Sequence, residues 1–156
     1  MKNDFQKAKN VCLRLLKYRL RSEKELRDRL TKKKFDNITV NKAIAYFKEI
    51  GLVNDAVFAK QWIESRLDKG LGAVRIKKEL KEKGIDSLTA DELLKEKLKD
   101  APEQEKVRQV IEKKLKAMHR GEDLEKLKRR IFAFLVRRGF SYDLVYEEIK
   151  KAFNDH

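Results

Sequence analysis

The sequence predicts an all-α protein, built as an elongated array of three tandem three-helix repeats. Charged residues make up 42% of the 156-residue chain, and apolar residues recur with the period of an α-helix. The chain holds one proline and six glycines, which permits long uninterrupted helices. The apolar pattern of residues 76–85 occurs again 50 residues earlier and 55 residues later. Self-similarity of this kind indicates an array of similar modules.

The repeated pattern is a short amphipathic helix followed by a turn. Ile76 and Leu80 lie one helical turn apart, and Gly84 is placed to end the helix in a left-handed conformation. We expect Leu80 to be a core residue with an equivalent in each repeat. The matching apolar positions are Leu26, Leu30 and Phe35 in the first copy, and Ile131, Leu135 and Phe140 in the third.

Residues 1–53 contain signals for three helices and form the first predicted repeat. Asp4 is placed to cap a helix that ends near residue 21, with Cys12 on its apolar stripe. Ser22 and Glu25 have the spacing of a capping box, which opens the second helix. The third helix starts near residue 38 and stops near residue 51. The other predicted core residues here are Phe5, Ala8, Leu15, Leu16, Val40, Ala43, Ile44 and Phe47.

Residues 54–99 form the second predicted repeat, whose middle helix is the segment around Leu80. Asn54 or Asp55 caps the fourth helix of the chain, which stops at residue 70. Thr89 and Glu92 have capping-box spacing and are predicted to open the sixth helix. The apolar stripes of these two flanking helices are Phe58, Ala59, Trp62, Ile63 and Leu67, and then Leu93, Leu94 and Leu98.

Residues 100–156 form the third predicted repeat. Asp100 is predicted to cap the seventh helix, with Pro102 in its first turn, and Gly121 to end it. The eighth helix is expected over about residues 123–138, and the ninth begins at Ser141. Their predicted inward residues are Val107, Ile111, Leu115, Met118, Leu124, Leu127, Phe134, Val145, Ile149, Ala152 and Phe153.

The net charge of +14 is the first indication of function. Residues 1–53 carry +9, residues 54–101 carry +1 and residues 102–156 carry +4. An excess of this size favours a polyanionic partner, which could be nucleic acid, an acidic protein surface or an anionic membrane. The alternative is that many lysines keep a helical protein in solution.

Basic residues gather near the helix-to-helix junctions of all three repeats. A periodic anionic partner such as a DNA backbone would meet one group of cations per module. Lysines near helix C-termini also favour the helix dipole, which explains part of the pattern without a ligand. The candidate residues for binding nucleic acid or a nucleic-acid filament are Arg19, Arg21, Lys24, Arg27, Lys32, Lys33, Lys34, Arg66, Lys69, Arg75, Lys77, Lys78, Lys81, Lys126, Lys128, Arg129, Arg130, Arg137 and Arg138.

Aromatic side chains that could stack on bases are sparse. Tyr18, Trp62 and Tyr142 are the candidates, and Trp62 lies on an apolar stripe, where we expect it to be a core residue.

Signals for catalysis or metal binding are weak. His119 and His156, the two histidines, lack companions with metal-ligand spacing. Gly70 and Gly72 resemble a phosphate loop only superficially, because the remaining glycines and the Gly-Lys-Ser/Thr ending are missing. We therefore expect no catalytic residues, no metal and no cofactor.

The chain has no apolar run long enough to span a membrane, and residues 1–5 lack the apolar core of a secretion signal. A lone cysteine, Cys12, cannot form an internal disulfide. We expect a cytoplasmic monomer that does not bind membranes.

Four segments together resemble the RecX family, which comprises bacterial regulators of the RecA recombinase. They are residues 20–26 (LRSEKEL), 51–59 (GLVNDAVFA), 69–72 (KGLG) and 137–142 (RRGFSY), and they occur in the order of the repeats. The chain departs from the family pattern at Lys34, where a glycine is common, and at Leu52, where an aromatic residue is common.

The resemblance implies a non-enzymatic protein that lies along RecA filaments on DNA and restrains filament growth and strand exchange. It supplies no catalytic residues. The alternative is a helical protein that binds DNA or RNA without sequence preference and without a recombinase partner. Binding to recombinase in the absence of DNA would separate the two.

Overall fold

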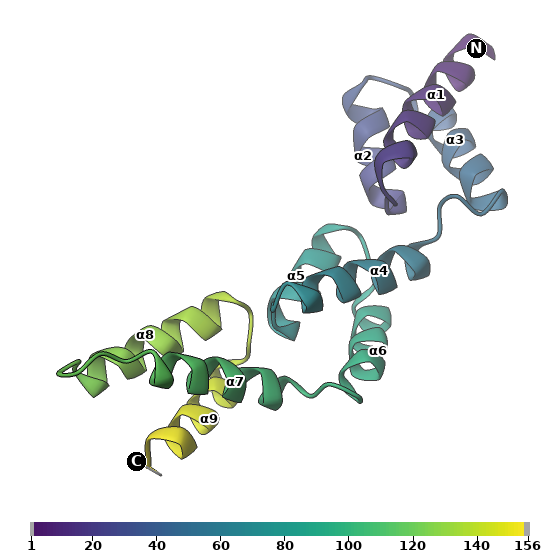
Figure 1. Ribbon diagram of the computed structural model, residues 1–156. Helices are drawn as coiled ribbons and strands as arrows, with labels where there is room; N and C mark the ends of the chain where they lie inside the picture. The colour runs from purple at the N-terminus through teal and green to yellow at the C-terminus, as the bar shows by residue number, and fades with distance from the viewer. Residues whose placement is uncertain (1, 155–156) are drawn as a thin grey trace. The chain divides into compact units, whose positions relative to one another are not determined.

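The computed structural model describes residues 2–154, which form nine α-helices joined by short turns and contain no strand (Figure 1). This confirms the predicted all-α class and the three tandem sets of three helices. The helices are α1 (Lys2–Tyr18), α2 (Glu23–Lys32), α3 (Asn37–Glu49), α4 (Asp55–Asp68), α5 (Ala73–Glu82), α6 (Ser87–Leu98), α7 (Glu103–Lys116), α8 (Leu124–Arg137) and α9 (Tyr142–Asn154).

Packing divides the chain into two compact units. The first extends through Trp62 and includes Leu80–Ala90, and the second consists of Ile63–Glu79 and the chain from Asp91 onward. The first and third repeats therefore each lie within one unit, while the second repeat contributes segments to both.

The first repeat packs α1 and α2 against α3. The predicted stripes face this core at helical spacing, although three predicted core residues, Phe5, Leu15 and Leu16, are only partly buried and pack against it. Cys12 is fully buried, and burial raises the pKa of its thiol to about 11, which fits a core residue. The buried residues are Ala8, Cys12, Leu26, Leu30, Val40, Ala43, Ile44, Phe47 and Val53.

In the second repeat, Trp62 was expected to be a core residue but is only half-buried. Its ring stacks on Phe58, with centroids 5.6 Å apart and planes inclined by 22°. The Lys83 ammonium lies 5.1 Å from the Trp62 ring centre. The buried apolar residues of the three helices and their turns are Phe58, Ala59, Ile63, Leu71, Ile76, Leu80, Ile85, Ala90 and Leu94.

The third repeat packs α7 and α8 against α9. Two residues predicted to lie inward are instead exposed, because Met118 follows the end of α7 and Leu124 is the first residue of α8. The buried residues are Val107, Ile111, Leu127, Ile131, Leu135, Phe140, Val145 and Ile149.

The same turn follows the middle helix of every repeat. The carbonyls of Leu30, Leu80 and Leu135 accept hydrogen bonds from the N–H groups five residues later, at 3.2, 2.9 and 3.2 Å. Each leucine is fully buried. The residue before each of these donors has positive φ, which closes the helix as a left-handed cap requires: Lys34 (71°), Gly84 (79°) and Gly139 (98°).

The predicted helix starts were correct in part. Ser22 and Glu25 form a complete capping box at α2, with hydrogen bonds of 3.2 and 3.0 Å. Asn54 accepts hydrogen bonds from two N–H groups at the start of α4, and Asp123 does the same at α8. Asp36, which was not predicted, caps α3 by accepting from the Thr39 N–H at 2.7 Å.

Other predicted helix ends were wrong. Asp4 lies inside α1, which starts at Lys2. Asp86, not Thr89, accepts the capping hydrogen bond at α6. At α7 the N-cap position belongs to Pro102 and no side chain caps the helix, so Asp100 does not serve as cap. α7 ends at Lys116, before the predicted stop at residue 121.

Candidate nucleic-acid interface

Seven of the nineteen candidate cations form salt bridges with neighbouring carboxylates. Exposed pairs such as Lys24–Asp28 and Lys77–Asp91 contribute little to stability, because water screens both charges. The Arg66–Glu79 pair is more enclosed, at 22% and 17% side-chain exposure, and therefore serves packing between helices. The seven are Arg19, Lys24, Arg27, Arg66, Arg75, Lys77 and Arg130.

The other twelve candidates form no salt bridge within residues 2–154. Their charges lack a salt-bridge partner among the described residues, which leaves them available to an external polyanion. They are Arg21, Lys32, Lys33, Lys34, Lys69, Lys78, Lys81, Lys126, Lys128, Arg129, Arg137 and Arg138.

Three of these twelve, Arg21, Arg129 and Arg138, donate hydrogen bonds to backbone carbonyls. The Arg21 guanidinium donates to the Leu15 carbonyl at 3.4 Å, and burial together with nearby Arg19 lowers its pKa from the ordinary arginine value. Arg138 donates to the Lys69 carbonyl at 3.2 Å. Arg21 and Arg138 are only partly exposed, so we infer that they act in packing more than in binding, whereas Arg129 is exposed.

Glu25 is the centre of the first-repeat cluster. Its carboxylate accepts from Arg19 at 2.6 Å, from Lys83 at 2.7 Å and from the Ser22 N–H at 3.0 Å. Burial by itself raises the pKa of this carboxyl, but these three donors outweigh burial and lower the pKa to about 2. The cluster around Glu25 is therefore a structural ion network, and the exposed cations beside it at residues 32–34 are the better binding candidates.

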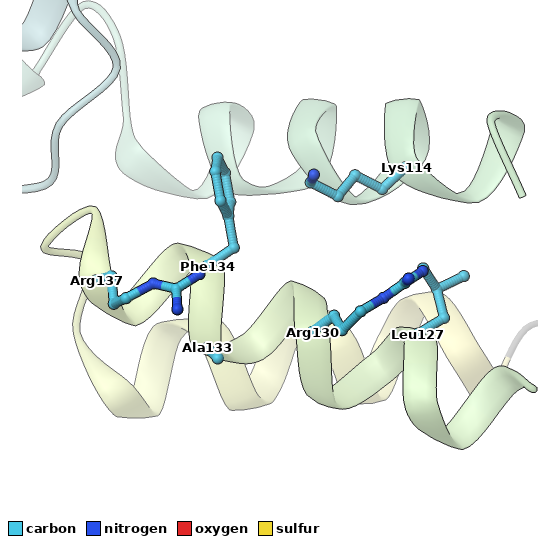
Figure 2. Close-up of a pocket in the computed structure, with 6 residues that line it drawn as sticks. All are labelled: Lys114, Leu127, Arg130, Ala133, Phe134 and Arg137. Carbon is cyan, nitrogen blue, oxygen red and sulfur yellow. The ribbon is translucent and has the colours of Figure 1, made fainter.

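A cavity of about 450 Å³ lies between α7 and α8 in the third repeat. Figure 2 shows Phe134 extending from α8 toward α7, where the Lys114 side chain runs beside the cavity. The Lys114 ammonium lies 4.5 Å from the Phe134 ring centre, and the Arg138 guanidinium carbon lies 5.1 Å from it. Arg130 and Arg137 complete the lining with Leu127 and Ala133, and no carboxylate lines the cavity.

This cavity is suited to an anion such as phosphate, because three cations line it without an acidic residue. Arg130 also pairs with Glu122 outside the lining. Lys114 was missing from the predicted site residues, since it belongs to α7 while the predicted cluster followed α8. The sequence feature that could have identified Lys114 is its position between Ile111 and Leu115, which places it beside the buried face of α7.

A second missed residue is Lys83, which holds the same repeat position as Lys33 and Arg138. Of the three, Lys33 is exposed, whereas Lys83 and Arg138 are only partly exposed. Lys83 binds Glu25, and Arg138 binds the Lys69 carbonyl. The two later cations of this series therefore connect neighbouring repeats.

The contacts between successive repeats are themselves repeated. At the first junction the Glu23 N–H donates to Asp55, the first residue of α4, at 2.9 Å. At the second junction the Ala73 N–H donates to Glu103, the first residue of α7, at 2.6 Å. In both cases a carboxylate at the start of one repeat satisfies an N–H at the first turn of the preceding repeat's middle helix.

Glycines make the closest approach at both junctions. A side chain at Gly84 would lie 2.6 Å from the β-carbon of Lys24. One at Gly139 would meet Arg75, and one at Gly72 would meet the backbone of Gly139. The Gly72 N–H also donates to the Arg138 carbonyl at 2.9 Å. Gly72 is therefore a packing residue at this junction, whereas a side chain at Gly70 would meet open space.

Among residues 2–154, no group of three or more histidine, cysteine, aspartate or glutamate side chains is arranged to hold a metal ion. His119 is exposed, and His156 lies outside the described residues. In the same range no helix is long and apolar enough to cross a membrane.

Residues 8–47, 54–94 and 102–149 match the family models for the first, second and third three-helix domains of RecX. The chain is 34% identical over 153 residues to the regulatory protein RecX of Amycolatopsis mediterranei strain U-32, covering 97% of this chain and 86% of that protein. It is 32% identical over 157 residues to the regulatory protein RecX of Clostridium perfringens strain SM101, covering 98% and 72%. The crystal structure of RecX from Lactobacillus salivarius superposes with a TM-score of 0.81 at 26% identity, covering 97% of each chain.

Proposed function

This chain belongs to the RecX family of regulatory proteins, and we propose that it binds RecA recombinase filaments on DNA and restrains their growth and strand exchange. The observation that carries the proposal is that all three RecX domains are present in order, and that each repeat bears exposed cations with no salt bridge to any described residue. Filaments of recombinase on DNA are periodic and polyanionic. Three linked basic modules suit such a partner.

The proposed action is occupancy without chemistry. Each module makes modest contacts with protein or phosphate, and each raises the effective concentration of the others. Inhibition then depends on stoichiometry and on salt, because phosphate contacts release counterions. We further propose that the chain acts as a cytoplasmic monomer, because the recombinase and its DNA are the partners.

We propose repeat boundaries at residues 1–53, 54–99 and 100–156. In support, α3 ends at Glu49 and α6 ends at Leu98, and each is followed by a short turn before the next repeat begins. The contacts of Asp55 and Glu103 at the two junctions lie just after these boundaries.

Co-sedimentation with recombinase tests the partner. We expect the full chain to pellet with RecA filaments on DNA and to bind RecA without DNA in a separate binding assay. Binding to DNA alone, with no binding to RecA in either assay, would favour the alternative of a nucleic-acid-binding helical protein. Failure to bind either component would contradict both.

A further inference from the structure

A second groove of the third repeat lies between α8 and α9, on the other side of α8 from the cavity of Figure 2. Its volume is about 360 Å³. The aromatic residues that line it are Phe132 on α8 and Tyr142 and Tyr146 on α9. We call it the tyrosine groove.

The two tyrosines are unusually exposed for large aromatic rings. Tyr142 is 65% exposed and Tyr146 is 54% exposed. Phe132 contacts Tyr142 edge to face, with ring centroids 4.7 Å apart and planes inclined by 78°. This contact orients the Tyr142 ring while leaving most of its surface in solvent.

The cations beside the tyrosines are available for binding. Lys128, Arg129 and Lys150 line the groove, and none forms a salt bridge within the described chain. Arg129 donates only to the Glu125 carbonyl, and Lys128 lies 5.7 Å from the Phe153 ring centre. One carboxylate, that of Glu125, also lines the groove, so its lining is basic by two charges.

The two grooves of α8 differ in what their aromatic rings contact. At the cavity of Figure 2, Lys114 and Arg138 lie over Phe134, so the protein's own cations already cover the face of that ring. In the part of the chain that the structure describes, no cation lies over Tyr142 or Tyr146. The cavity therefore offers cations alone, whereas the tyrosine groove offers cations and open aromatic faces.

We propose that the tyrosine groove binds unpaired bases of single-stranded DNA. Bases stack on Tyr142 and Tyr146, and the adjoining phosphates lie against Lys128, Arg129 and Lys150. A duplex fits this chemistry poorly, because its bases already stack on one another and present no open face to the rings. The inference rests on the proposed binding of DNA and deepens it by naming the strand type and the groove.

The test compares two fluorescent strands of equal length, oligo-dT and a strand of abasic sites, by anisotropy titration. Both carry the same phosphates, so the ratio of their affinities reports contacts to the bases, and the tyrosine variants identify the part due to stacking in the groove. We expect the full wild-type chain to bind oligo-dT at least about five-fold more tightly than the abasic strand. The variant Y142A/Y146A should lose this preference and bind the abasic strand as the wild type does.

Three further variants keep the result interpretable. Y142F/Y146F retains both rings and should retain the preference, whereas Y146A, which leaves the Phe132–Tyr142 contact intact, should lose part of it. Y18A removes a tyrosine that is 79% exposed in the first repeat and should have no effect. Circular dichroism confirms the fold of each variant.

Three outcomes would overturn the inference: equal wild-type affinity for the two strands, a preference that survives in Y142A/Y146A, or no wild-type binding to either strand. Co-sedimentation with RecA, run in parallel, separates this failure from failure of the proposed function. If Y142A/Y146A loses RecA binding but keeps the strand preference, the groove is a protein contact and the inference is wrong. If the wild type binds RecA but neither strand, the inference fails while the recombinase contact stands.

Discussion

Among the described residues, Lys34 is the only non-glycine residue with positive φ, at 71°. The equivalent positions hold Gly84 and Gly139, which pack against Lys24 and Arg75 of the preceding repeat's middle helix. Lys34 is exposed, so its side chain meets no such obstacle and a lysine is tolerated there. The backbone conformation nonetheless disfavours an L residue with a β-carbon.

Replacing Lys34 with glycine should therefore stabilise the protein. We expect Lys34→Gly to raise the free energy of unfolding by about 1 kcal/mol, because glycine adopts the left-handed conformation without strain. Urea denaturation followed by circular dichroism measures the change. Lys34→Ala removes the same charge but keeps the strain, and should give no gain. Equal stabilisation by both variants would mean that loss of charge, not relief of strain, is the cause.

Glu25 gives the first repeat a defined response to acid. The pKa of its carboxyl is lowered from 4.5 to about 2. Between these two pH values, the carboxyl is therefore mostly ionised in the folded state and mostly protonated in the unfolded state. The stabilisation is fully present above the ordinary value of 4.5 and is lost as the pH falls through about 2. The free energy of unfolding should thus fall as the pH is lowered from 4.5 to about 2.

The variant Glu25→Gln should be about 1–3 kcal/mol less stable at neutral pH, because Arg19 and Lys83 lose their charged partner. Its stability should also decline less between pH 4.5 and pH 2 than that of the wild type. Glu82→Gln, at an exposed carboxylate of α5, serves as the control. Urea titrations across this pH range measure the free energy of unfolding of each protein. If this free energy fell equally with pH in the wild type and in Glu25→Gln, the ion network around Glu25 would not be the cause of the acid response.

The middle helix of each repeat has a fully buried leucine at the same repeat position. Leu30, Leu80 and Leu135 are each inaccessible to solvent, and the carbonyl of each accepts the hydrogen bond that closes the following turn. In all three repeats, the same leucine is thus both buried in the core and bonded through its carbonyl to the turn that ends the helix.

Truncation of any of these leucines to alanine should cost about 2–5 kcal/mol, because it removes buried methyl groups and leaves a cavity. Leu88→Ala, at a leucine that is 70% exposed, should cost far less. Chemical denaturation monitored by helical circular dichroism provides the comparison. A loss at Leu30, Leu80 or Leu135 no larger than at Leu88 would show that these positions are not core.

Helix type and core were readable from the sequence because they depend on local spacing. The interval between Leu26 and Leu30 identifies a helix face without knowledge of the partner helix. Helix starts were less readable, since several capping residues stand close together: both Asp86 and Thr89 precede a helical stripe, and only Asp86 accepts the capping hydrogen bond.

The candidate interface was only partly readable, because ion pairing depends on residues far apart in the chain. Glu25 binds Lys83 across 58 positions, and no local pattern in either segment signals that pair. The sequence therefore placed Arg19 with Lys33 in one basic cluster, although Arg19 is held by Glu25 and Lys33 is exposed without a salt bridge in residues 2–154. Lys114 was missed because it reaches the cavity beside α8 from α7.

Binding of an external polyanion by the whole molecule depends on which cations are free to meet it. Five exposed cations from all three repeats form no salt bridge within the described residues. They are Lys33, Lys78, Lys81, Arg129 and Arg137. Reversing their charge should remove contacts with the filament and leave the buried cores unchanged.

A control with the same change in net charge comes from five other exposed cations that lie outside the candidate set. None of them forms a salt bridge in the described part of the chain, and they too come from all three repeats. They are Lys7, Arg14, Lys60, Lys95 and Lys116. This matched variant separates the placement of charge from its total.

The most direct measurement is RecA-driven strand exchange in the presence of equimolar wild-type chain, the variant K33E/K78E/K81E/R129E/R137E, or the control K7E/R14E/K60E/K95E/K116E. Circular dichroism first confirms that all three proteins are folded. We predict that the wild type and the control slow strand exchange to a similar extent, and that the five-site candidate variant slows it far less. Equal inhibition by the two variants, or no inhibition by the wild-type chain, would contradict the account.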